Sequence, residues 1–260
     1  MKILMITPFP PDGIGGAETF IKDVSKHHEV ILCTKEKRKK VWKGLGLLNL
    51  ISVFPLMMTK SFLMVLRNHL DVIHAQGLIS GMIAVILKKI FKVKVFLTLL
   101  ALYDFKNKSR TFKAVCLFVF KNCDVIFVEG ENGKKDIEIF NQQKKVKVFN
   151  HWVDQDIFKP DRLAKNTSQD KIRVLFVGRP IPEKGKHIIE EAEKKINQPD
   201  KYHFTYVQDI PHDLLPSYYQ MADVVVVPSL YPEGFCRVVA ESASCGCAVI
   251  TSDKGSLPDM

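Results

Sequence analysis

The sequence lacks the features that mark secreted and membrane-spanning proteins. Its six cysteines show no paired spacing of a disulfide framework, and Met1 leads into a short apolar run rather than a signal-peptide pattern. The longest stretch without charge, Gly44 to Thr59, is shorter than the ~20 residues that span a bilayer. We therefore expect a cytoplasmic protein without disulfides and without a transmembrane helix.

Metal-ligand sets and nucleic-acid-binding modules are also missing. Cys236, Cys245 and Cys247 lie close together, but no nearby histidine and no second cysteine pair completes a zinc set. No recognised nucleic-acid-binding module is present, and no set of stacking aromatic residues lies among the basic ones. We expect neither a bound metal nor a nucleic-acid partner.

Positive charge is concentrated in the first part of the chain. Residues 1–160 hold 26 Lys and Arg against 14 Asp and Glu, whereas residues 161–260 hold 12 against 14. The segment 41–70 combines many apolar residues with Lys60 and Arg67, which fits a helix in a membrane interface. A helix packed on a sheet and a solvated lysine-rich surface fit as well, so an anionic membrane surface stays an open alternative.

Short apolar runs alternate with helix-compatible stretches, and 260 residues suffice for two domains. This alternation predicts the α/β class, with two Rossmann-like domains of parallel strands that face each other across a cleft. A polar segment at 158–170 predicts a linker, so we place the domains at 1–160 and 161–260. The predicted strands lie at 2–7, 29–34, 71–74, 93–98, 124–128, 146–149, 172–177, 203–207, 223–227 and 248–251.

The segment 224–253 carries the strongest functional signal. A β-branched run ends at Pro228, and a polar loop, a helix-compatible stretch and a second apolar strand follow. This order places Glu233 in the loop before the helix and Glu241 inside the helix. Carboxylates bind sugar hydroxyls, and free amides at a helix N-terminus bind phosphate, so the segment predicts a nucleotide-sugar site.

Two other loops follow predicted strands. Arg179 and Lys184 follow the first strand of the second set, and their charges would neutralise a pyrophosphate. Ligands of open α/β sheets lie beyond the carboxyl ends of the strands, which favours this role over a solvated loop. The glycines of GIGGAE, at 13, 15 and 16, fit either a ligand loop or a tight turn. His74 ends a strand and fits either ligand contact or packing.

These residues carry a resemblance to a known family. FVGRPIPEKG followed by PSLYPEGFCRVVAESASCGCAVITSD resembles the donor-binding half of the retaining glycosyltransferases of family 4, which have the GT-B fold. GIGGAE, DVIHAQG and NHWVDQDIFKPD are also similar to that family, so the resemblance runs along nearly the whole chain. The pattern of Glu233, seven residues and Glu241 is its most specific part.

The resemblance implies roles for individual residues. Arg179 and Lys184 would hold the donor diphosphate, Glu233 the hydroxyls of the transferred sugar, and Glu241 the ribose hydroxyls. Glu233, Arg179 and Lys184 are thus the expected catalytic group, and Glu241 joins the donor-binding group. The further donor-binding candidates are Gly15, Gly16, Gly234, Phe235, Cys236 and His74.

The implied reaction is a hexosyl transfer from a nucleotide diphosphate sugar to a hydroxyl, without a metal or a cofactor, and with retention of configuration. Basic side chains and a helix N-terminus would stabilise the leaving diphosphate. The acceptor would be a glycan. In one alternative this glycan is linked to a lipid or associated with a membrane, and the enzyme is peripheral on the inner face of the cell membrane. A nucleotide-sugar-binding protein with little transfer activity is the rival hypothesis, and an epimerase or a phosphorylase is a weaker one.

Three departures from the family pattern stand out. TLLALYD lacks the histidine that the family shows after the strand at 93–98, EGFC carries Cys236 where the family has glycine, and the second domain is incomplete or minimal. The first departure bears on transfer activity and the second on the identity of the sugar. The nucleotide base, the sugar, the acceptor and the oligomeric state stay undetermined by the sequence.

Overall fold

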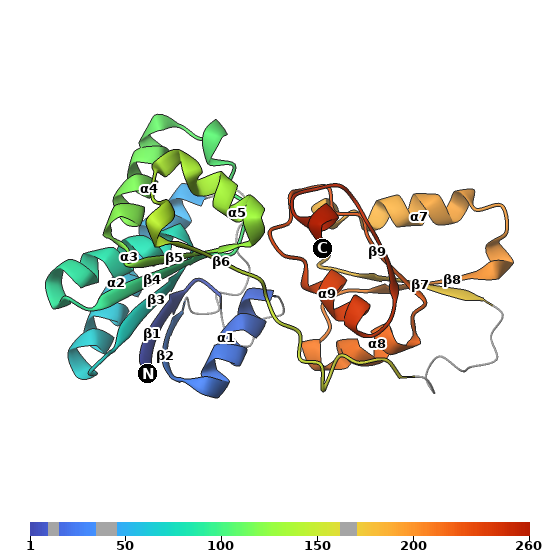
Figure 1. The fold of residues 1–260 in the computed structure, drawn as a ribbon, viewed down its shortest axis with the longest axis horizontal. Helices are drawn as coiled ribbons and strands as arrows, with labels where there is room; N and C mark the ends of the chain where they lie inside the picture. The colour runs from blue at the N-terminus through green and yellow to red at the C-terminus, as the bar shows by residue number, and fades with distance from the viewer. Residues whose placement is uncertain (10–15, 35–45, 162–170) are drawn as a thin grey trace. The chain divides into compact units, whose positions relative to one another are not determined.

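The computed structural model describes residues 1–9, 16–34, 46–161 and 171–260. Within these ranges the chain forms two compact units, Met1–Phe149 and Asn150–Met260, each built on one sheet (Figure 1). All strand pairs are parallel and helices connect them, which confirms the predicted pair of Rossmann-like α/β domains. The glycine-rich turn at 10–15 and the linker residues 162–170 lie outside the described residues.

The first unit holds a sheet of six strands in the order β2-β1-β3-β4-β5-β6. Every strand predicted from the sequence is present, with ends that differ by two residues at most. The elements are β1 Lys2–Thr7, α1 Gly16–His27, β2 Glu29–Thr34, α2 Gly46–Arg67, β3 Val72–Gln76, α3 Gly77–Phe91, β4 Lys94–Leu99, α4 Arg110–Asn122, β5 Val125–Glu129, α5 Gly130–Ile137 and β6 Val146–Phe149.

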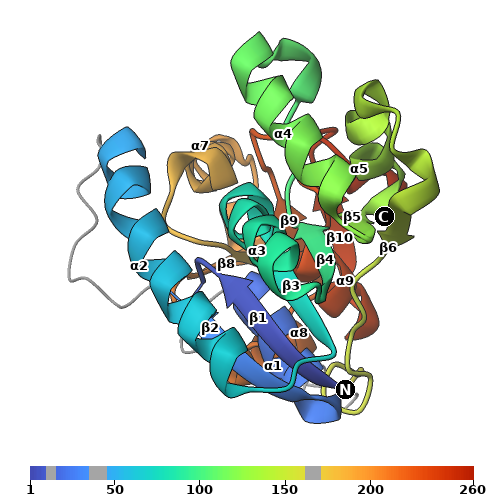
Figure 2. The same cartoon turned by 90° about the vertical axis from the view of Figure 1, so that its left-hand side faces the viewer.

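Helices cover both faces of the first sheet. Leu4 and Ile6 of β1 belong to the core that α2, α3, α4 and α5 share, whereas Met5 between them packs with Phe20 and Ile21 of α1. The chain moves one way along the sheet from β1 to β2 and the other way from β2 onward, so right-handed crossovers place α1 opposite the other helices. In sequence order α2, α3 and α4 pack side by side (Figure 2).

The second unit holds a sheet of four strands in the order β10-β9-β7-β8. Helices α8 and α9 contribute Tyr219 and Val239 to a core shared with Leu175 of β7 and Val225 of β9. The elements are β7 Ile172–Val177, α7 Lys186–Lys195, β8 Tyr202–Val207, α8 Leu215–Met221, β9 Val224–Val227, α9 Arg237–Ser244 and β10 Ala248–Thr251.

The second unit begins eleven residues before the predicted domain start at 161, and Phe158 provides the physical reason. Its ring is buried in the core of the second unit, and its carbonyl accepts a hydrogen bond of 2.7 Å from Ser244 Oγ. Phe158, the first residue of the predicted linker, therefore belongs to the second unit.

The described part of the chain contains no helix long and apolar enough to cross a membrane. All six cysteines are buried and unpaired by disulfides. Among the same residues, no group of three His, Cys, Asp or Glu side chains could hold a metal ion.

Candidate functional site

Two loops at the carboxyl ends of neighbouring strands build the candidate site in the second unit. One loop follows β7, ends in a short 3-10 turn at Pro182–Lys184 and leads into α7. The other follows β9 and leads into α9. Because β7 and β9 pair directly in the sheet, both loops leave it at the same edge.

Gly185 fixes the distance between these two loops. Its φ of +74° is a conformation that side chains disfavour, and a Cβ there would lie 2.1 Å from the Pro228 carbonyl oxygen. Leu230 N also donates a hydrogen bond of 2.8 Å to the Glu183 carbonyl. The close backbone approach places Lys184, one residue earlier, beside the loop that carries Glu233.

Glu233 lies in a buried polar cluster of four side chains. Its Oε1 accepts hydrogen bonds from Lys184 Nζ at 2.7 Å and Ser229 Oγ at 2.6 Å, and its Oε2 accepts one from Tyr231 OH at 2.9 Å. Only 6% of Glu233 is exposed. The structure thus brings two of the predicted catalytic residues, Lys184 and Glu233, into direct contact.

The charge of Lys184 is maintained by this cluster. Burial lowers the pKa of Lys184, but the charge of Glu233 and the hydrogen bonds with Glu233 and Tyr231 outweigh burial, so the pKa is raised overall. The Nζ atom also lies 5.1 Å from the centroid of the Tyr231 ring. Lys184 therefore remains an ammonium ion at neutral pH and can attract a phosphate.

The backbone of Glu233 is held from its other side by Gly255. These two residues form an isolated parallel bridge, and Ser256 N donates to the Glu233 carbonyl at 2.9 Å. A Cβ at Gly255 would lie 2.3 Å from that carbonyl oxygen, so only glycine fits. The loop with Glu233 is thus enclosed by backbone on both sides, which fixes the position of its carboxylate.

Residues 234–236 lead into the N-terminus of α9. Gly234 is buried and Phe235 is half-buried, with its ring 5.2 Å from that of His151. Cys236 is the N-cap residue without a side-chain cap, and its backbone N donates to Met260 Sδ at 3.5 Å. Burial, with the charge of Glu233, raises the pKa of the Cys236 thiol to about 11, so the thiol is protonated and unreactive at neutral pH.

Glu241 lies in a separate buried ion pair on α9. Its Oε1 accepts hydrogen bonds from Arg237 Nε at 2.9 Å and from His212 Nε2 at 2.7 Å, and its side chain is 1% exposed. Arg237 stands one helical turn before Glu241, so the two side chains share a face of the helix. The structure therefore orients the Glu241 carboxylate through two residues that the sequence did not single out.

Arg179 is exposed and forms no ion pair with any residue that the structure describes. Its carbonyl accepts a hydrogen bond of 2.8 Å from Ile181 N, which shapes the loop before Lys184. Gly15 lies outside the described residues, and Gly16 is the first residue of α1. The predicted ligand roles of these three residues stay predictions.

His74 lies in the interior of the first unit, where it is 7% exposed. Its Nε2 lies 2.6 Å from Thr98 Oγ1, and its ring meets that of Phe20 edge-on at 5.9 Å between centroids. Burial lowers the pKa of His74 to about 4, so the imidazole is neutral at physiological pH. These contacts favour packing as its role, and ligand contact stays a prediction.

The neutral state of His74 predicts that acid destabilises the protein. The unfolded chain binds a proton below a pKa of about 6.5 and the folded chain only near 4, so the free energy of unfolding falls as the pH falls between these values. From about pH 7 to pH 5 we expect a loss of about 2 kcal/mol. Urea unfolding at both pH values measures it. A His74→Gln variant keeps a polar group beside Thr98 but does not titrate there, and an equal loss in this variant would contradict the prediction.

Solved structures identify the fold to which this arrangement belongs. Sucrose-phosphate synthase from Thermosynechococcus elongatus superimposes with a TM-score of 0.77 at 20% identity, over 98% of this chain and 82% of the other. HepE of Anabaena, solved in complex with UDP-glucose, superimposes with a TM-score of 0.71 at 15% identity, over 100% and 82%. The two parallel α/β units thus define a protein of the GT-B fold.

Residues 161–260 belong to the group 1 glycosyl transferases, the family 4 proteins of this fold, as the sequence resemblance indicated. Residues 161–260 match the family model described as "Glycosyl transferases group 1". D-inositol 3-phosphate glycosyltransferase of Corynebacterium aurimucosum is 25% identical over 240 residues, which is 72% of this chain. An uncharacterized glycosyltransferase of Methanocaldococcus jannaschii is 24% identical over 100% of this chain and 82% of its own. The chain spans 56% of the Corynebacterium relative's length.

Proposed function

We propose that the protein is a retaining glycosyltransferase that moves a sugar from a nucleotide diphosphate donor to a hydroxyl acceptor. The observation that carries this proposal is the buried contact between Lys184 and Glu233, 2.7 Å long, where the loops after β7 and β9 meet. A cation for a phosphate and a carboxylate for sugar hydroxyls stand side by side there. The match of residues 161–260 to the group 1 glycosyl transferases supports the same activity.

Each charged group has a part in the proposed site. Lys184 and Arg179 hold the diphosphate, and amides of 234–236 at the start of α9 add hydrogen bonds to phosphate or sugar oxygens. Glu233 accepts hydrogen bonds from the sugar hydroxyls, which replace those that it accepts from Ser229 and Tyr231. The basic groups and the helix N-terminus take the place of a metal in stabilising the leaving group.

Glu241 is proposed to accept hydrogen bonds from the ribose hydroxyls. Arg237 and His212 both donate to its carboxylate, and the contact with Arg237 keeps it oriented, which reduces the entropy lost when a nucleotide binds. Because the side chain is only 1% exposed, ribose contact requires one of these two partners to move aside. His212 is the more exposed of the two, with 29% of its side chain accessible, so we propose that His212 is the one that moves.

The proposed reaction breaks the bond between the anomeric carbon of the donor sugar and the diphosphate oxygen. The acceptor hydroxyl oxygen forms the new bond on the same face of the sugar, and its proton passes to the leaving phosphate. The negative charge that develops on the diphosphate is stabilised by Lys184, whose raised pKa keeps it charged. The acceptor is proposed to be a glycan carried by a lipid or a membrane on the cytoplasmic side, and the sugar a hexose.

The alternative function is nucleotide-sugar binding without turnover. The sequence TLLALYD favours it, because β4 ends at Leu99 and no histidine follows in the next five residues, where the family has one. A protein of this kind would use the same Lys184 and Glu233 to hold the donor but would release it intact.

A panel of nucleotides and nucleotide sugars tests both candidates. Thermal shift with UDP, GDP, UDP-glucose and GDP-mannose identifies the base, because a ligand that binds only the folded state raises its apparent stability. UDP-glucose is the first donor to test, since HepE was solved with it. Release of the free nucleoside diphosphate supports a transferase, and saturable binding without release supports the binding protein. Absence of any shift across the panel contradicts both.

A further inference from the structure

Three neighbouring helices of the first unit contain no acidic residue. Helices α2, α3 and α4 together carry seven Lys or Arg and no Asp or Glu. In contrast, α1 and α7 carry charges of both signs. The three helices pack side by side on one face of the sheet, so their solvent sides form one continuous surface.

Helix stability accounts for part of this charge bias. Arg67, Lys88, Lys89 and Lys121 stand in the last turns of their helices, where the negative end of the dipole favours cations. The positive end of a helix dipole favours acidic residues in the first turn, but none of these three helices has one there. Helix α4 even begins with a cation, Arg110, at its positive end. The dipole therefore explains where several of the cations stand, but not why all three helices lack acids.

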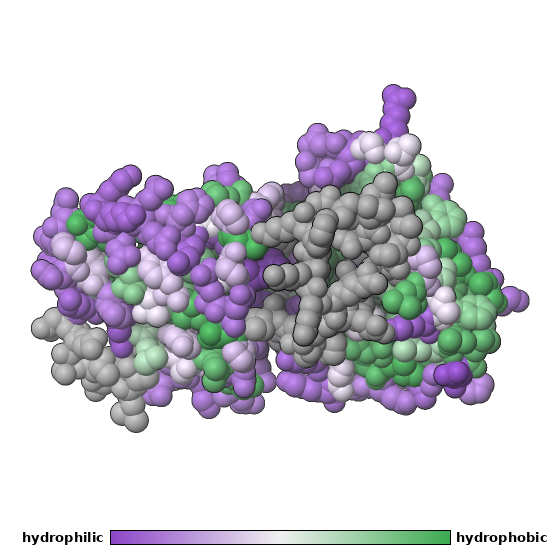
Figure 3. Space-filling view, turned by 180° about the vertical axis from the view of Figure 1, so that it is seen from behind, coloured by the Kyte–Doolittle hydropathy of each residue, from purple (hydrophilic) through white to green (hydrophobic). Residues whose placement is uncertain are grey.

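The same surface exposes large apolar side chains. Leu56, Leu63 and Leu66 are spaced by seven and three residues, which aligns them on one side of α2, and 57% of Leu66 is exposed. Figure 3 shows green apolar surface between purple polar side chains on the first unit. We define the basic-apolar face by the exposed residues Leu56, Leu63, Leu66, Ile90, Val115 and Phe118, together with the Lys and Arg residues of α2, α3 and α4 other than Lys88. Lys88 is left out because it forms an ion pair of 2.6 Å with Asp124.

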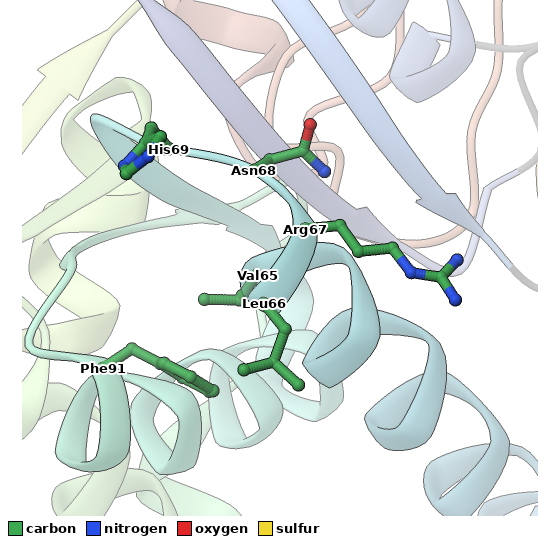
Figure 4. A pocket seen from close by; sticks show the side chains of 6 residues that line it. All are labelled: Val65, Leu66, Arg67, Asn68, His69 and Phe91. Atoms are coloured by element: carbon green, nitrogen blue, oxygen red, sulfur yellow. The ribbon is translucent and has the colours of Figure 1, made fainter.

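Basic and apolar groups are interleaved on this face. Lys89 of α3 lies 4.6 Å above the ring of Phe118 of α4, so a cation and an aromatic side chain share one spot. At the ends of α2 and α3, Leu66, Arg67 and Phe91 are among the residues that line a hollow of about 220 Å³ (Figure 4). Cations that flank apolar side chains match the anionic headgroups and acyl chains of a bilayer surface.

We propose that the basic-apolar face docks the protein on an anionic lipid bilayer. The lysines and arginines of this face contact the headgroups, and its exposed leucines and Phe118 insert at the boundary with the acyl chains. This inference stands independently of the proposed transfer reaction, because it rests on a different unit of the chain. No helix of the described residues could span a membrane. Docking through this face would still bring the enzyme to an acceptor that lies in the membrane.

Binding to vesicles tests the proposal. The protein should co-float with phosphatidylcholine vesicles that contain about one-third phosphatidylserine, and much less with pure phosphatidylcholine. A Lys89→Glu, Arg110→Glu variant should bind the anionic vesicles at least about tenfold more weakly. Its matched control is Lys194→Glu, Lys195→Glu on α7, which makes the same change in net charge at exposed positions of the other unit. An equal loss in the control overturns the proposal.

A second variant separates docking from general electrostatics. Leu63→Asn with Leu66→Asn leaves the net charge unchanged and should weaken vesicle binding about tenfold. Circular dichroism checks that each variant is folded, and Arg110→Glu should not lower Tm because it places an acid at a helix N-terminus. If the wild type binds no vesicles, or if sedimentation shows that these leucines instead join two copies of the chain, the proposal is wrong.

Discussion

Replacing Lys184 with methionine should lower kcat for sugar transfer by about 100- to 1,000-fold, the loss seen when one preorganised electrostatic contact to a leaving group is removed. Methionine keeps much of the volume of the lysine stem but leaves the departing diphosphate without its nearest buried cation. The variant also leaves Glu233 buried with only Ser229 and Tyr231 as partners. Steady-state kinetics with the donor identified by the nucleotide panel measures the effect.

Lys186 provides the matched control for this variant. It lies two residues further along, at the start of α7, and its ion pair with Glu190 is partly exposed, with 33% of the lysine side chain accessible. Exposed pairs of this kind contribute little to stability, so the Lys186→Met variant should stay folded. Because no donor contact is proposed for Lys186, its kcat should change by no more than about twofold. Comparable losses in both variants would show that positive charge near the loop matters in general and would refute a specific role for Lys184.

Replacing Glu241 with alanine should destabilise the second unit by about 3–5 kcal/mol, because it leaves a buried cation without its partner. Arg237 is 11% exposed, and among the described residues its Nη1 already lacks a hydrogen-bond partner. His212 loses its hydrogen bond as well. Urea unfolding at neutral pH measures the change, and a loss below about 1 kcal/mol would contradict a structural ion pair.

A double variant separates the structural role of Glu241 from its proposed contact with ribose. Arg237→Met with Glu241→Leu removes both charges and fills their space, which commonly restores the stability that breaking a buried pair loses. We expect this variant to be more stable than Glu241→Ala and still unable to bind the nucleoside diphosphate tightly. Isothermal titration measures the affinity, and wild-type affinity in the double variant would exclude Glu241 from ribose binding.

The strands were predictable because they read as short apolar runs between polar segments. The run at 224–227 is a strand in the structure, as predicted, and it ends where Pro228 can no longer donate to the sheet. The parallel arrangement followed from the alternation with helices. The start of the second unit was not predictable, because the polar residues around Phe158 hide that its ring completes a core built from residues far along the chain.

The candidate site was predictable in its charged residues but not in their partners. Lys184 and Glu233 were both placed in loops at one sheet edge, and the sheet order, in which β9 lies beside β7, brings the two loops together. The spacing of Arg237 and Glu241 by four residues on a predicted helix was a signal for their ion pair that the sequence interpretation missed. His212 carried no such signal, since its approach to Glu241 depends on how α8 packs against α9.

The glycines at 185 and 255 have a consequence for anyone who wishes to redesign the sugar preference of this protein. Each is fitted against the main chain of the loop between β9 and α9, so a side chain at either position would displace the loop itself. Libraries that vary these two codons would chiefly yield misfolded clones. Ser229 and Tyr231 hydrogen-bond to Glu233 through their side chains, so diversity introduced at those two positions can change the surroundings of the Glu233 carboxylate while the loop backbone stays intact.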